Sequence, residues 1–529
     1  MDLMIRAATV LDGTGAPEVV ADVGVDAGRI VAIGKDLPDA RRAIEADGLV
    51  LSPGFIDMHT HSDLQILANP DHTAKVGQGV TTEVLGQDGL SFAPVDDETR
   101  AVIRRQIAGW NGEPDDFDFS WSSVAGYLDR LDRGVACNAA YLIPQGTVRM
   151  LVMGTNDRAA TPDELDRMKD LVATGMREGA AGMSSGLTYT PGMFATTDEL
   201  VELCRVVASC GGYYSPHQRS YGKGALEAYA EMIEVSRRSG CPLHLAHAVM
   251  NFAPNRGRGA ELLALLDDAL ASGVDVTTDT YPYVSAATTL AAVLPSWTAV
   301  GGPDAQLARL KTDRERIWYE LEQVGTDGFH GCVADWSAVE ISGVRNPLLA
   351  EAVGRNIAEL ARTGGVPPSQ VFFDLLTGDQ LATTILWHIG HEENVRTIMR
   401  HRTHCGGSDG ILAGAKPHPR AWATFARYLG HYVRELGILE LADCVHHLTG
   451  RPAARLRLVD RGLIREGYHA DLVLFDPERV RDTATYAEPQ RQPAGIEWVF
   501  VNGTAVIEAG GRTDAMPGRA LRMTDRGTR

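Results

Sequence analysis

Histidines that follow apolar runs are the residues of this 529-residue chain best placed to do chemistry. His59 and His61 come directly after the apolar run in GFIDMHTHSD. Alternate residues of a strand point to the same side, so these two imidazoles converge as a chelating pair must. Neutral imidazole nitrogens suit zinc, with bonds of about 2.0–2.1 Å. The spacing therefore predicts a metal site at the end of a strand.

Two further histidines stand at the ends of later strand-like segments. His217 ends YYSPH, and His247 follows PLHLA one β-α unit further along the chain. In a closed barrel of parallel strands both would reach the C-terminal face beside the first pair, where the active sites of such folds are assembled. His244 lies three residues before His247, so on an extended strand it faces the opposite side, and we predict a structural role for it.

A metal-dependent hydrolase also needs a general base, and a carboxylate can provide it. Asp409 in HCGGSDGIL lies at another strand-to-loop junction, where glycines on both sides leave space for a substrate. Zinc lowers the pKa of a bound water to about 7, and a nearby carboxylate takes up its proton and hands it to a departing nitrogen. The set predicts a hydrolase that uses metal-activated water, with Asp409 as metal ligand and general base and acid.

The elements that must position these side chains alternate between strand and helix. Thr161 and Glu164, with a proline between them, form a capping box ahead of a helical pattern, and Thr196 and Glu199 repeat it. From there to residue 283, strand-like and helical segments alternate with a repeat of about 30 residues, as in parallel strands joined by crossover helices. This repeat is compatible both with a doubly wound sheet and with a closed barrel.

Turn-rich β segments flank this region. Asp26-Ala27-Gly28 and Asn502-Gly503 are hairpin signals between runs of strand-forming residues. We expect the two ends of the chain to pair into one β-sandwich around a central metal-binding domain, with bounds 1–55, 56–464 and 465–529. The less regular stretch at about 286–365 is predicted to be an insertion, either a lid over the active site or a passive excursion.

The composition limits the class of protein. Hydrophobic residues make up 44% and charged residues 22%, as in soluble globular proteins. A net charge of -19 without a basic stripe argues against a nucleic-acid groove, and seven cysteines without a CxxC pair indicate neither disulfides nor a thiolate zinc site. No signal peptide or apolar run of about 18 residues is present, so a cytoplasmic enzyme with a small-molecule substrate, no membrane contact and a possible homo-oligomeric state is expected.

The order of the candidate ligands resembles that of the amidohydrolase superfamily. PGFIDMHTHSD, GLTYTPGMFA, DTYPY, GSDG and PHPR resemble, in order and over nearly the whole chain, segments of the D-aminoacylase or N-acyl-D-amino-acid deacylase family. The resemblance implies a (β/α)₈ TIM-like barrel with a composite β-sandwich, one or two zinc ions, and hydrolysis of the amide C–N bond of N-acyl-D-amino acids. It also implies that Arg420 grips the substrate carboxylate, and that Tyr189 and Tyr283 lie near the substrate.

The chain departs from that family at two positions. Asp88 stands where the family has a metal-binding cysteine. An aspartate is an anionic ligand that can bridge two ions, but it is a harder donor that favours other divalent ions over zinc. We predict that Asp88 binds metal; the alternative is that it only supports the turn in Gln87-Asp88-Gly89.

The second departure is Val249, where the family has a lysine that helps to hold the substrate carboxylate. This loss keeps other readings open. One is a hydrolase of cyclic amides, or a deaminase, on the same scaffold. A more remote one is a barrel without catalytic activity that serves as an assembly partner.

Overall fold

Eight parallel strands form a closed barrel in the centre of the chain. The computed structural model describes residues 1–114 and 116–522. Neighbouring barrel strands follow the order β16-β12-β11-β10-β9-β8-β7-β6, and the ring closes where the Met58 N–H donates to the Gly406 carbonyl at 3.2 Å. The closure decides between the two architectures in favour of the (β/α)₈ barrel. The strands are β6 Phe55–Asp57, β7 Val80–Leu85, β8 Asn138–Pro144, β9 Gly182–Gly186, β10 Tyr213–His217, β11 Leu243–Leu245, β12 Val276–Thr280 and β16 His404–Gly406.

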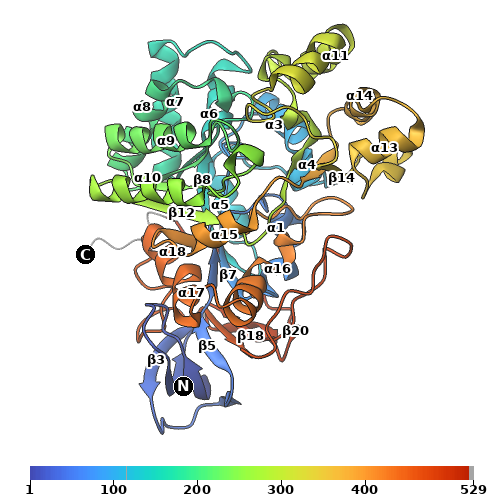
Figure 1. The fold of residues 1–529 in the computed structure, drawn as a ribbon. Helices are drawn as coiled ribbons and strands as arrows, with labels where there is room; N and C mark the ends of the chain where they lie inside the picture. The colour runs from blue at the N-terminus through green and yellow to red at the C-terminus, as the bar shows by residue number, and fades with distance from the viewer. Residues whose placement is uncertain (115, 523–529) are drawn as a thin grey trace.

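Helices cover the outside of this barrel (Figure 1). They are α1 Gln65–Ala68, α2 Thr73–Val76, α3 Asp97–Gln106, α4 Ala108–Asn111, α5 Val124–Leu131, α6 Gln145–Met153, α7 Pro162–Arg177, α8 Thr197–Ser209, α9 Ala225–Ser239, α10 Gly259–Ala271, α15 Glu392–Met399, α16 Arg420–Arg427, α17 Leu441–Leu448 and α18 Gly450–Arg455. Among the described residues, we find no helix with both the length and the apolar character needed to cross a bilayer.

The capping pattern correctly located two of these helices. At α7 the expected box is complete, because the Thr161 hydroxyl accepts from the Glu164 N–H at 3.3 Å and the Glu164 carboxylate accepts from the Thr161 N–H at 2.9 Å. At α8 the hydroxyl of Thr196 caps the helix, but the Glu199 carboxylate turns inward and accepts hydrogen bonds from Gln145 and Arg149. The second box is therefore only half formed, since a buried guanidinium needs an anionic partner more than a backbone amide does.

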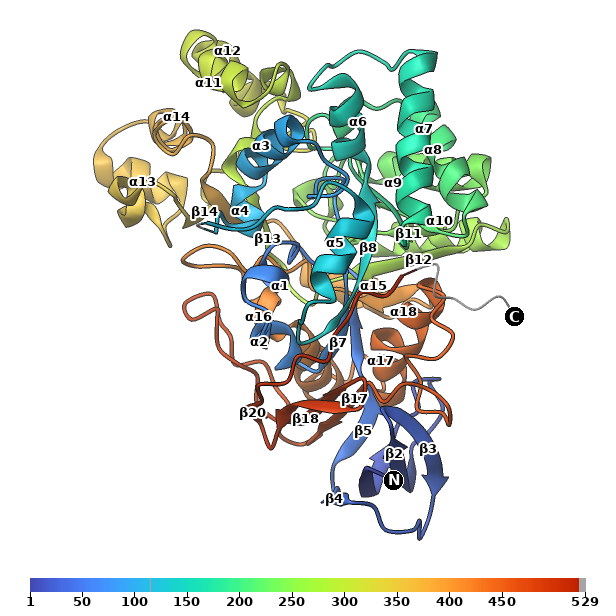
Figure 2. The same ribbon diagram turned by 180° about the vertical axis from the view of Figure 1, so that it is seen from behind.

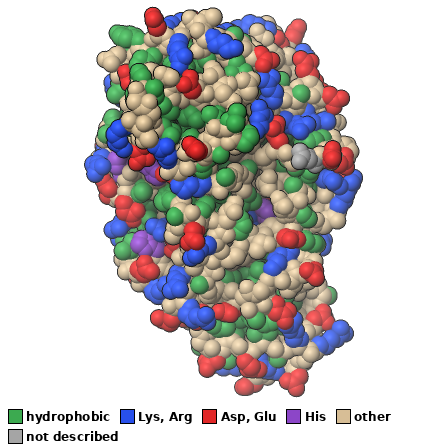
Figure 3. Space-filling model, turned by 90° about the vertical axis from the view of Figure 1, so that its right-hand side faces the viewer, with side chains coloured by type: hydrophobic (Ala, Val, Ile, Leu, Met, Phe, Trp, Pro, Cys, Tyr) green, Lys and Arg blue, Asp and Glu red, His purple; other side chains and the backbone are tan. Residues whose placement is uncertain are grey.

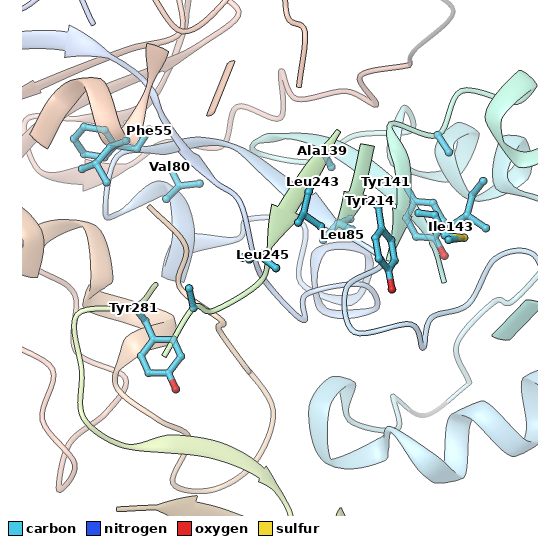
Figure 4. Close-up of a cluster of buried hydrophobic side chains, with 14 of the residues drawn as sticks. Phe55, Val80, Leu85, Ala139, Tyr141, Ile143, Tyr214, Leu243, Leu245 and Tyr281 are labelled. Carbon is cyan, nitrogen blue, oxygen red and sulfur yellow. The ribbon is translucent and has the colours of Figure 1, made fainter. Parts of the chain in front are cut away.

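The barrel strands alternate between two apolar layers. Ala139, Tyr141 and Ile143 of β8 lie in the large core between the strands and the outer helices (Figure 4). Ala140 and Leu142, the residues between them, lie in a separate cluster with side chains of the other barrel strands. This period of two is what a strand buried on both faces requires, and it explains why these segments read as continuous apolar runs.

Both ends of the chain contribute to one sheet, in the order β20-β19-β18-β17-β5-β1-β2-β3, with β4 paired to β1. At both hairpin signals the two turn residues have positive φ: Ala27 47° and Gly28 77°, Asn502 50° and Gly503 80°. These are the dihedral signs of the two-residue turns that match strand twist. The strands lie together at one end of the molecule (Figure 1): β1 Leu3–Val10, β2 Val19–Asp26, β3 Arg29–Gly34, β4 Arg42–Glu45, β5 Val50–Pro53, β17 Leu472–Phe475, β18 Ile496–Val501, β19 Thr504–Glu508 and β20 Gly511–Arg512.

A separate module interrupts the barrel between β12 and α15. It has a three-stranded antiparallel sheet in the order β13-β15-β14 and its own apolar core, which includes Phe329, Trp336, Phe372 and Trp387. Its elements are β13 Ala286–Thr289, α11 Pro303–Thr312, α12 Arg314–Tyr319, β14 Val339–Gly343, α13 Ile357–Gly364, α14 Pro368–Gly378 and β15 Thr384–Trp387. The module continues to Trp387, beyond the irregular stretch at about 286–365, and its helices lie far from the terminal strands (Figure 2).

Candidate active site

The structure brings all six sequence-predicted metal ligands together at the carboxyl ends of the barrel strands. Each is buried and lies at the end of a strand or in the loop that follows it. They are His59 and His61 after β6, Asp88 after β7, His217 at the end of β10, His247 after β11 and Asp409 after β16. Residues far apart in the sequence thus meet because parallel strands of one barrel end on the same face.

Asp88 lies in the middle of the cluster. Its Oδ1 is 3.5 Å from Nε2 of His59 and 3.5 Å from Nε2 of His247. Its Oδ2 is 3.2 Å from Nδ1 of His217 and 3.5 Å from Nε2 of His61. One carboxylate therefore faces all four imidazoles, a position from which it could serve as a metal ligand.

Asp409 occupies the opposite side of the first histidine pair. Its Oδ1 is 3.2 Å from Nε2 of His61 and 3.6 Å from Nε2 of His59. Its Oδ2 is 2.8 Å from Nη2 of Arg420. Two groups of three residues could each hold a metal ion, because the donor atoms within each group lie within 4.8 Å of one another. One group is His59, Asp88 and His247, and the other is His59, His61 and Asp409.

The donor set fits divalent cations. Both ring nitrogens of His59 and Oδ1 of Asp88 are buried and have no hydrogen-bond partner among the described residues. Leaving buried polar atoms unpaired costs about 1–3 kcal/mol for each group, so a native fold rarely does so without a ligand. Imidazole nitrogens and carboxylate oxygens are the donors that zinc accepts. The cluster can thus hold one ion or two.

The charges of the cluster favour ionised carboxylates. Burial raises the pKa of Asp88, but His217, His59 and His247 outweigh burial and hold this pKa well below its usual range. Burial also raises the pKa of Asp409, and the charge of Arg420 with the hydrogen bond from His61 lowers it below the usual range. For His61, burial lowers the pKa, whereas Asp409 and Asp88 raise it to about 9. Both aspartates are therefore anionic at neutral pH, as metal ligands must be.

The backbone at three of the ligands adopts an uncommon conformation. Asp88, His247 and Asp409 have φ values of 54°, 31° and 48°. Residues other than glycine rarely adopt positive φ; each such case costs about 1–3 kcal/mol and persists only where the surrounding contacts offset this cost. The Asp409 N–H donates to the His59 carbonyl at 2.8 Å, which ties two of the ligand loops together. At these three positions the uncommon backbone conformation helps to aim the side chains at one point.

An aspartate that the sequence reasoning missed makes hydrogen bonds to His244 and His247 and lies near His59. Asp279, at the end of β12, lies with its Oδ2 3.1 Å from Nε2 of His244 and 3.7 Å from Nδ1 of His59. Its Oδ1 accepts from the His247 N–H at 3.0 Å. His244 has the structural place expected for it, because it contacts Asp279 and Thr277 and not the ligand cluster. The signal was available, since Asp279 ends a strand of the same barrel just before Tyr281 and Tyr283.

A buried ion pair supports the cluster from behind. The Lys75 ammonium, which is 0% exposed, lies 2.6 Å from Oδ2 of Asp57 and 2.8 Å from the hydroxyl of Ser408. Asp57 in turn accepts from the backbone N–H groups of Ser408 at 2.8 Å and His59 at 3.3 Å. The pair thereby anchors the strand ends that carry His59 and Asp409.

Removing the cation of this pair is expected to destabilise the protein. Lys75→Met leaves the Asp57 carboxylate buried and uncompensated, so the free energy of unfolding should fall by about 3–5 kcal/mol. Urea denaturation followed by circular dichroism measures this change. Lys169→Met is the matched control, because it breaks an exposed pair with Asp166 at 2.8 Å and should change the free energy by less than about 1 kcal/mol. Equal effects of the two variants would contradict the anchoring role.

Comparison with known proteins agrees with this geometry. Residues 42–507 match the amidohydrolase family. The chain belongs to the amidohydrolase family. The expected metal-dependent amidohydrolase, which cleaves an amide C–N bond on a (β/α)₈ barrel, is thereby confirmed.

Named relatives of this amidohydrolase match it over nearly the whole length. A D-aminoacylase of Alcaligenes xylosoxydans xylosoxydans is 36% identical, with 99% of this chain and 98% of the relative covered. An N-acyl-D-aspartate deacylase of the same organism is 34% identical, with 99% and 95% covered. A solved N-acyl-D-glutamate deacylase of Bordetella bronchiseptica, in complex with zinc and a phosphonate inhibitor, has a TM-score of 0.83 and 32% identity over 99% of both chains.

A cavity opens beside the ligand cluster of this amidohydrolase. Tyr189 lines it, with its ring 4.9 Å from that of His217. Val249 also lines it, so the position of the family's lysine is an apolar part of the wall. Residues from the inserted module contribute as well, among them His330 and Trp387.

The other two predicted substrate-binding residues lie elsewhere. Arg420 is fully buried behind Asp409, with its guanidinium 4.4 Å from the ring centre of Tyr281. Tyr283 is not among the residues that line the cavity; its ring packs against His418 at 5.1 Å and Arg427 at 4.8 Å. Tyr281, which the sequence reasoning did not select, lines the cavity instead. Which of these two tyrosines reaches the cavity depends on the conformation of the loop after β12, and a motif match does not reveal that conformation.

On the face in Figure 3, basic, acidic and apolar side chains are interspersed.

Proposed function

We propose that this amidohydrolase hydrolyses N-acyl-D-amino acids to a carboxylic acid and a free D-amino acid. One or two zinc ions would be held by the six clustered residues His59, His61, Asp88, His217, His247 and Asp409. The observation that carries the proposal is the placement of Asp409, with one carboxylate oxygen facing His59 and His61 and the other facing Arg420. The near full-length similarity to D-aminoacylase and to the deacylases of acidic N-acyl-D-amino acids supports the substrate class.

Asp409 moves the proton in this reaction. When bound, the metal supplies the Lewis acidity that activates a water molecule for attack on the amide carbonyl. The ionised Asp409 accepts the proton that this water loses as the C–O bond forms. Arg420 favours the anionic state of the carboxylate, so a protonated Asp409 is a strong acid that readily passes its proton to the nitrogen as the C–N bond breaks.

Substrate panels test the proposal. Amine release is measured with N-acetyl-D-amino acids, N-acetyl-L-amino acids and cyclic amides, each with zinc-supplemented and metal-stripped enzyme. Turnover of the D-series that depends on metal is the expected result. Turnover of the L-series alone, or release of amine without metal, would contradict the proposal.

A second candidate function is the hydrolysis of a cyclic or uncharged amide. The observation that favours it is the cavity wall, since no lysine or arginine is among the residues that line the cavity beside the cluster in the described part of the chain. In the same panel, ring opening of cyclic amides without turnover of the D-series would support this candidate.

Restoring the missing cation should strengthen the binding of a substrate carboxylate. Val249→Lys places an ammonium in the cavity wall, and a charge-assisted hydrogen bond contributes about 1.5–3 kcal/mol. We expect KM for N-acetyl-D-amino acids to fall by about tenfold or more, with kcat changed little. Steady-state kinetics measures both values, and Val249→Met is the control of similar length without charge. An equal KM for the two variants would show that no carboxylate binds near residue 249.

Tyr189 and Tyr281, which line the cavity, are the substrate-binding residues that we propose. A contact of Arg420 with the substrate carboxylate remains a prediction from the sequence. The role of Tyr283, a cytoplasmic location and a homo-oligomeric state remain predictions from the sequence.

A further inference from the structure

A second cavity adjoins the one beside the ligand cluster. The two share five lining residues, Trp110, Thr188, Tyr189, Ala292 and Gly328. The second cavity lies between the loops after the barrel strands and the inserted module, because both contribute to its wall. The rings of Trp110 and Tyr189 touch, with centroids 4.8 Å apart, so a substrate bound at the ligand cluster would reach the second cavity beside this pair of rings and not between them.

The wall of the second cavity is suited to an apolar group. Ile107, Leu187, Met193, Leu294, Pro295 and Leu381 are among its lining residues. Its charged residues already have partners. Arg105 pairs with Asp304 at 2.8 Å, and Arg219 pairs with Glu231 at 2.9 Å.

The remaining carboxylate in this wall is satisfied too, because Asp327 accepts from the backbone N–H groups of Ser296 at 2.9 Å and Gly328 at 3.0 Å. These charged groups therefore do not need a charged ligand as a partner. An apolar ligand, by contrast, would be released from water on entry.

The barrel order indicates which half of the substrate faces this cavity. Asp409 follows β16 and must reach the leaving nitrogen, so the amino-acid half lies on the β16 side, together with Arg420. Tyr189 follows β9, and in the ring of eight strands three strands separate β9 from β16 in either direction. The acyl half, on the other side of the breaking C–N bond, therefore extends toward the β9 loop and the shared residues.

We propose that the second cavity is an acyl-chain subsite, and that the preferred substrates carry an unbranched acyl chain longer than acetyl. The inference rests on the proposed function, since it assigns a place to the acyl group of the same N-acyl-D-amino acids. An acetyl group would end at the ligand cluster and leave the apolar walls beyond Trp110 in contact with water only.

A homologous series of substrates tests this assignment. In N-acyl-D-alanines from acetyl to octanoyl, each added methylene that leaves water should raise kcat/KM by about fourfold until the cavity is filled. The octanoyl substrate should thus exceed the acetyl substrate by more than about 100-fold. A flat or falling series would overturn the proposal.

A variant locates the effect in the second cavity. Ala291 lines the second cavity but not the first, so Ala291→Phe should lower the octanoyl-to-acetyl ratio of kcat/KM at least tenfold. Ala350→Phe adds the same ring to an exposed position of the same module and should leave the ratio unchanged. An unchanged ratio in Ala291→Phe would overturn the location.

Two further measurements separate the possible failures. If kcat/KM rises with side-chain length in N-acetyl-D-alanine, N-acetyl-D-norvaline and N-acetyl-D-norleucine but not with acyl length, the cavity holds the side chain and the proposal is wrong. Calorimetric titration of metal-stripped protein with N-octanoyl-D-alanine and N-acetyl-D-alanine reports binding without turnover. At least tenfold tighter binding of the octanoyl compound supports the subsite even if neither compound is hydrolysed, in which case the proposed function fails alone.

Discussion

Asp409→Asn is expected to lower kcat by about 10²–10⁴-fold, the usual contribution of a positioned general acid or base. An amide has nearly the size and shape of the carboxylate, so the contacts with His59 and His61 keep their geometry. The asparagine cannot take the proton from water or return it to the leaving nitrogen. Steady-state kinetics with saturating zinc measures the loss, and metal analysis of the purified variant should show that the ions remain.

The same substitution affects stability through a neighbour. Arg420 is fully buried and its ion pair in the described structure is with Asp409, at 2.8 Å. Asp409→Asn leaves this guanidinium without its counter-charge, and breaking a buried pair in this way costs about 3–5 kcal/mol. The double variant Asp409→Asn with Arg420→Met removes both charges, and it should regain stability without regaining turnover. Recovered turnover in either variant would exclude Asp409 as the proton carrier.

Asp88→Ala should remove metal and activity together. Its carboxylate faces all four histidines of the cluster at 3.2–3.5 Å. Alanine therefore removes one anionic ligand from the proposed metal site. Substitution of residues that only support metal ligands already costs about 10–100-fold in affinity or activity, so the loss here should exceed about 100-fold. Metal analysis after dialysis and kinetics with added zinc measure the two effects. A variant with full metal content and normal kcat would return Asp88 to the role of a turn residue.

Asp88→Cys is the matched variant, because it restores the thiolate that the related family carries at this position. A thiolate is a softer donor than a carboxylate, so the preference for zinc over manganese should increase. Competition between the two ions, followed by metal analysis, tests this expectation. An unchanged preference would mean that residue 88 does not contact the ion.

The local elements were predictable because their signals are local. The hairpin at Ala27-Gly28 requires two residues with positive φ, and the helix at Pro162–Arg177 begins at a complete capping box. Glu199 shows the limit of such reasoning. Its capping role could be assigned from spacing, but a distant buried arginine, Arg149, took the carboxylate instead.

The sequence by itself determined the chemistry of the site and the family of the protein. Histidines and aspartates at the ends of strands identify a metal-dependent hydrolase, because one barrel places all strand ends on one face. The substitutions at Asp88 and Val249 were also visible, since each changes the donor atoms available.

Only the tertiary structure decided how these residues are arranged in space. It placed Asp88 among four imidazoles, put Asp279 behind His59, chose Tyr281 over Tyr283 for the cavity wall, and buried Arg420 against Asp409. It also joined the inserted module to the barrel loops around a second cavity. Most of these features depend on contacts between segments far apart in the sequence, such as those of His59 and Asp279, which are 220 positions apart. Distances of a few ångströms between such segments are set by packing of the whole fold, which no local pattern of residues records.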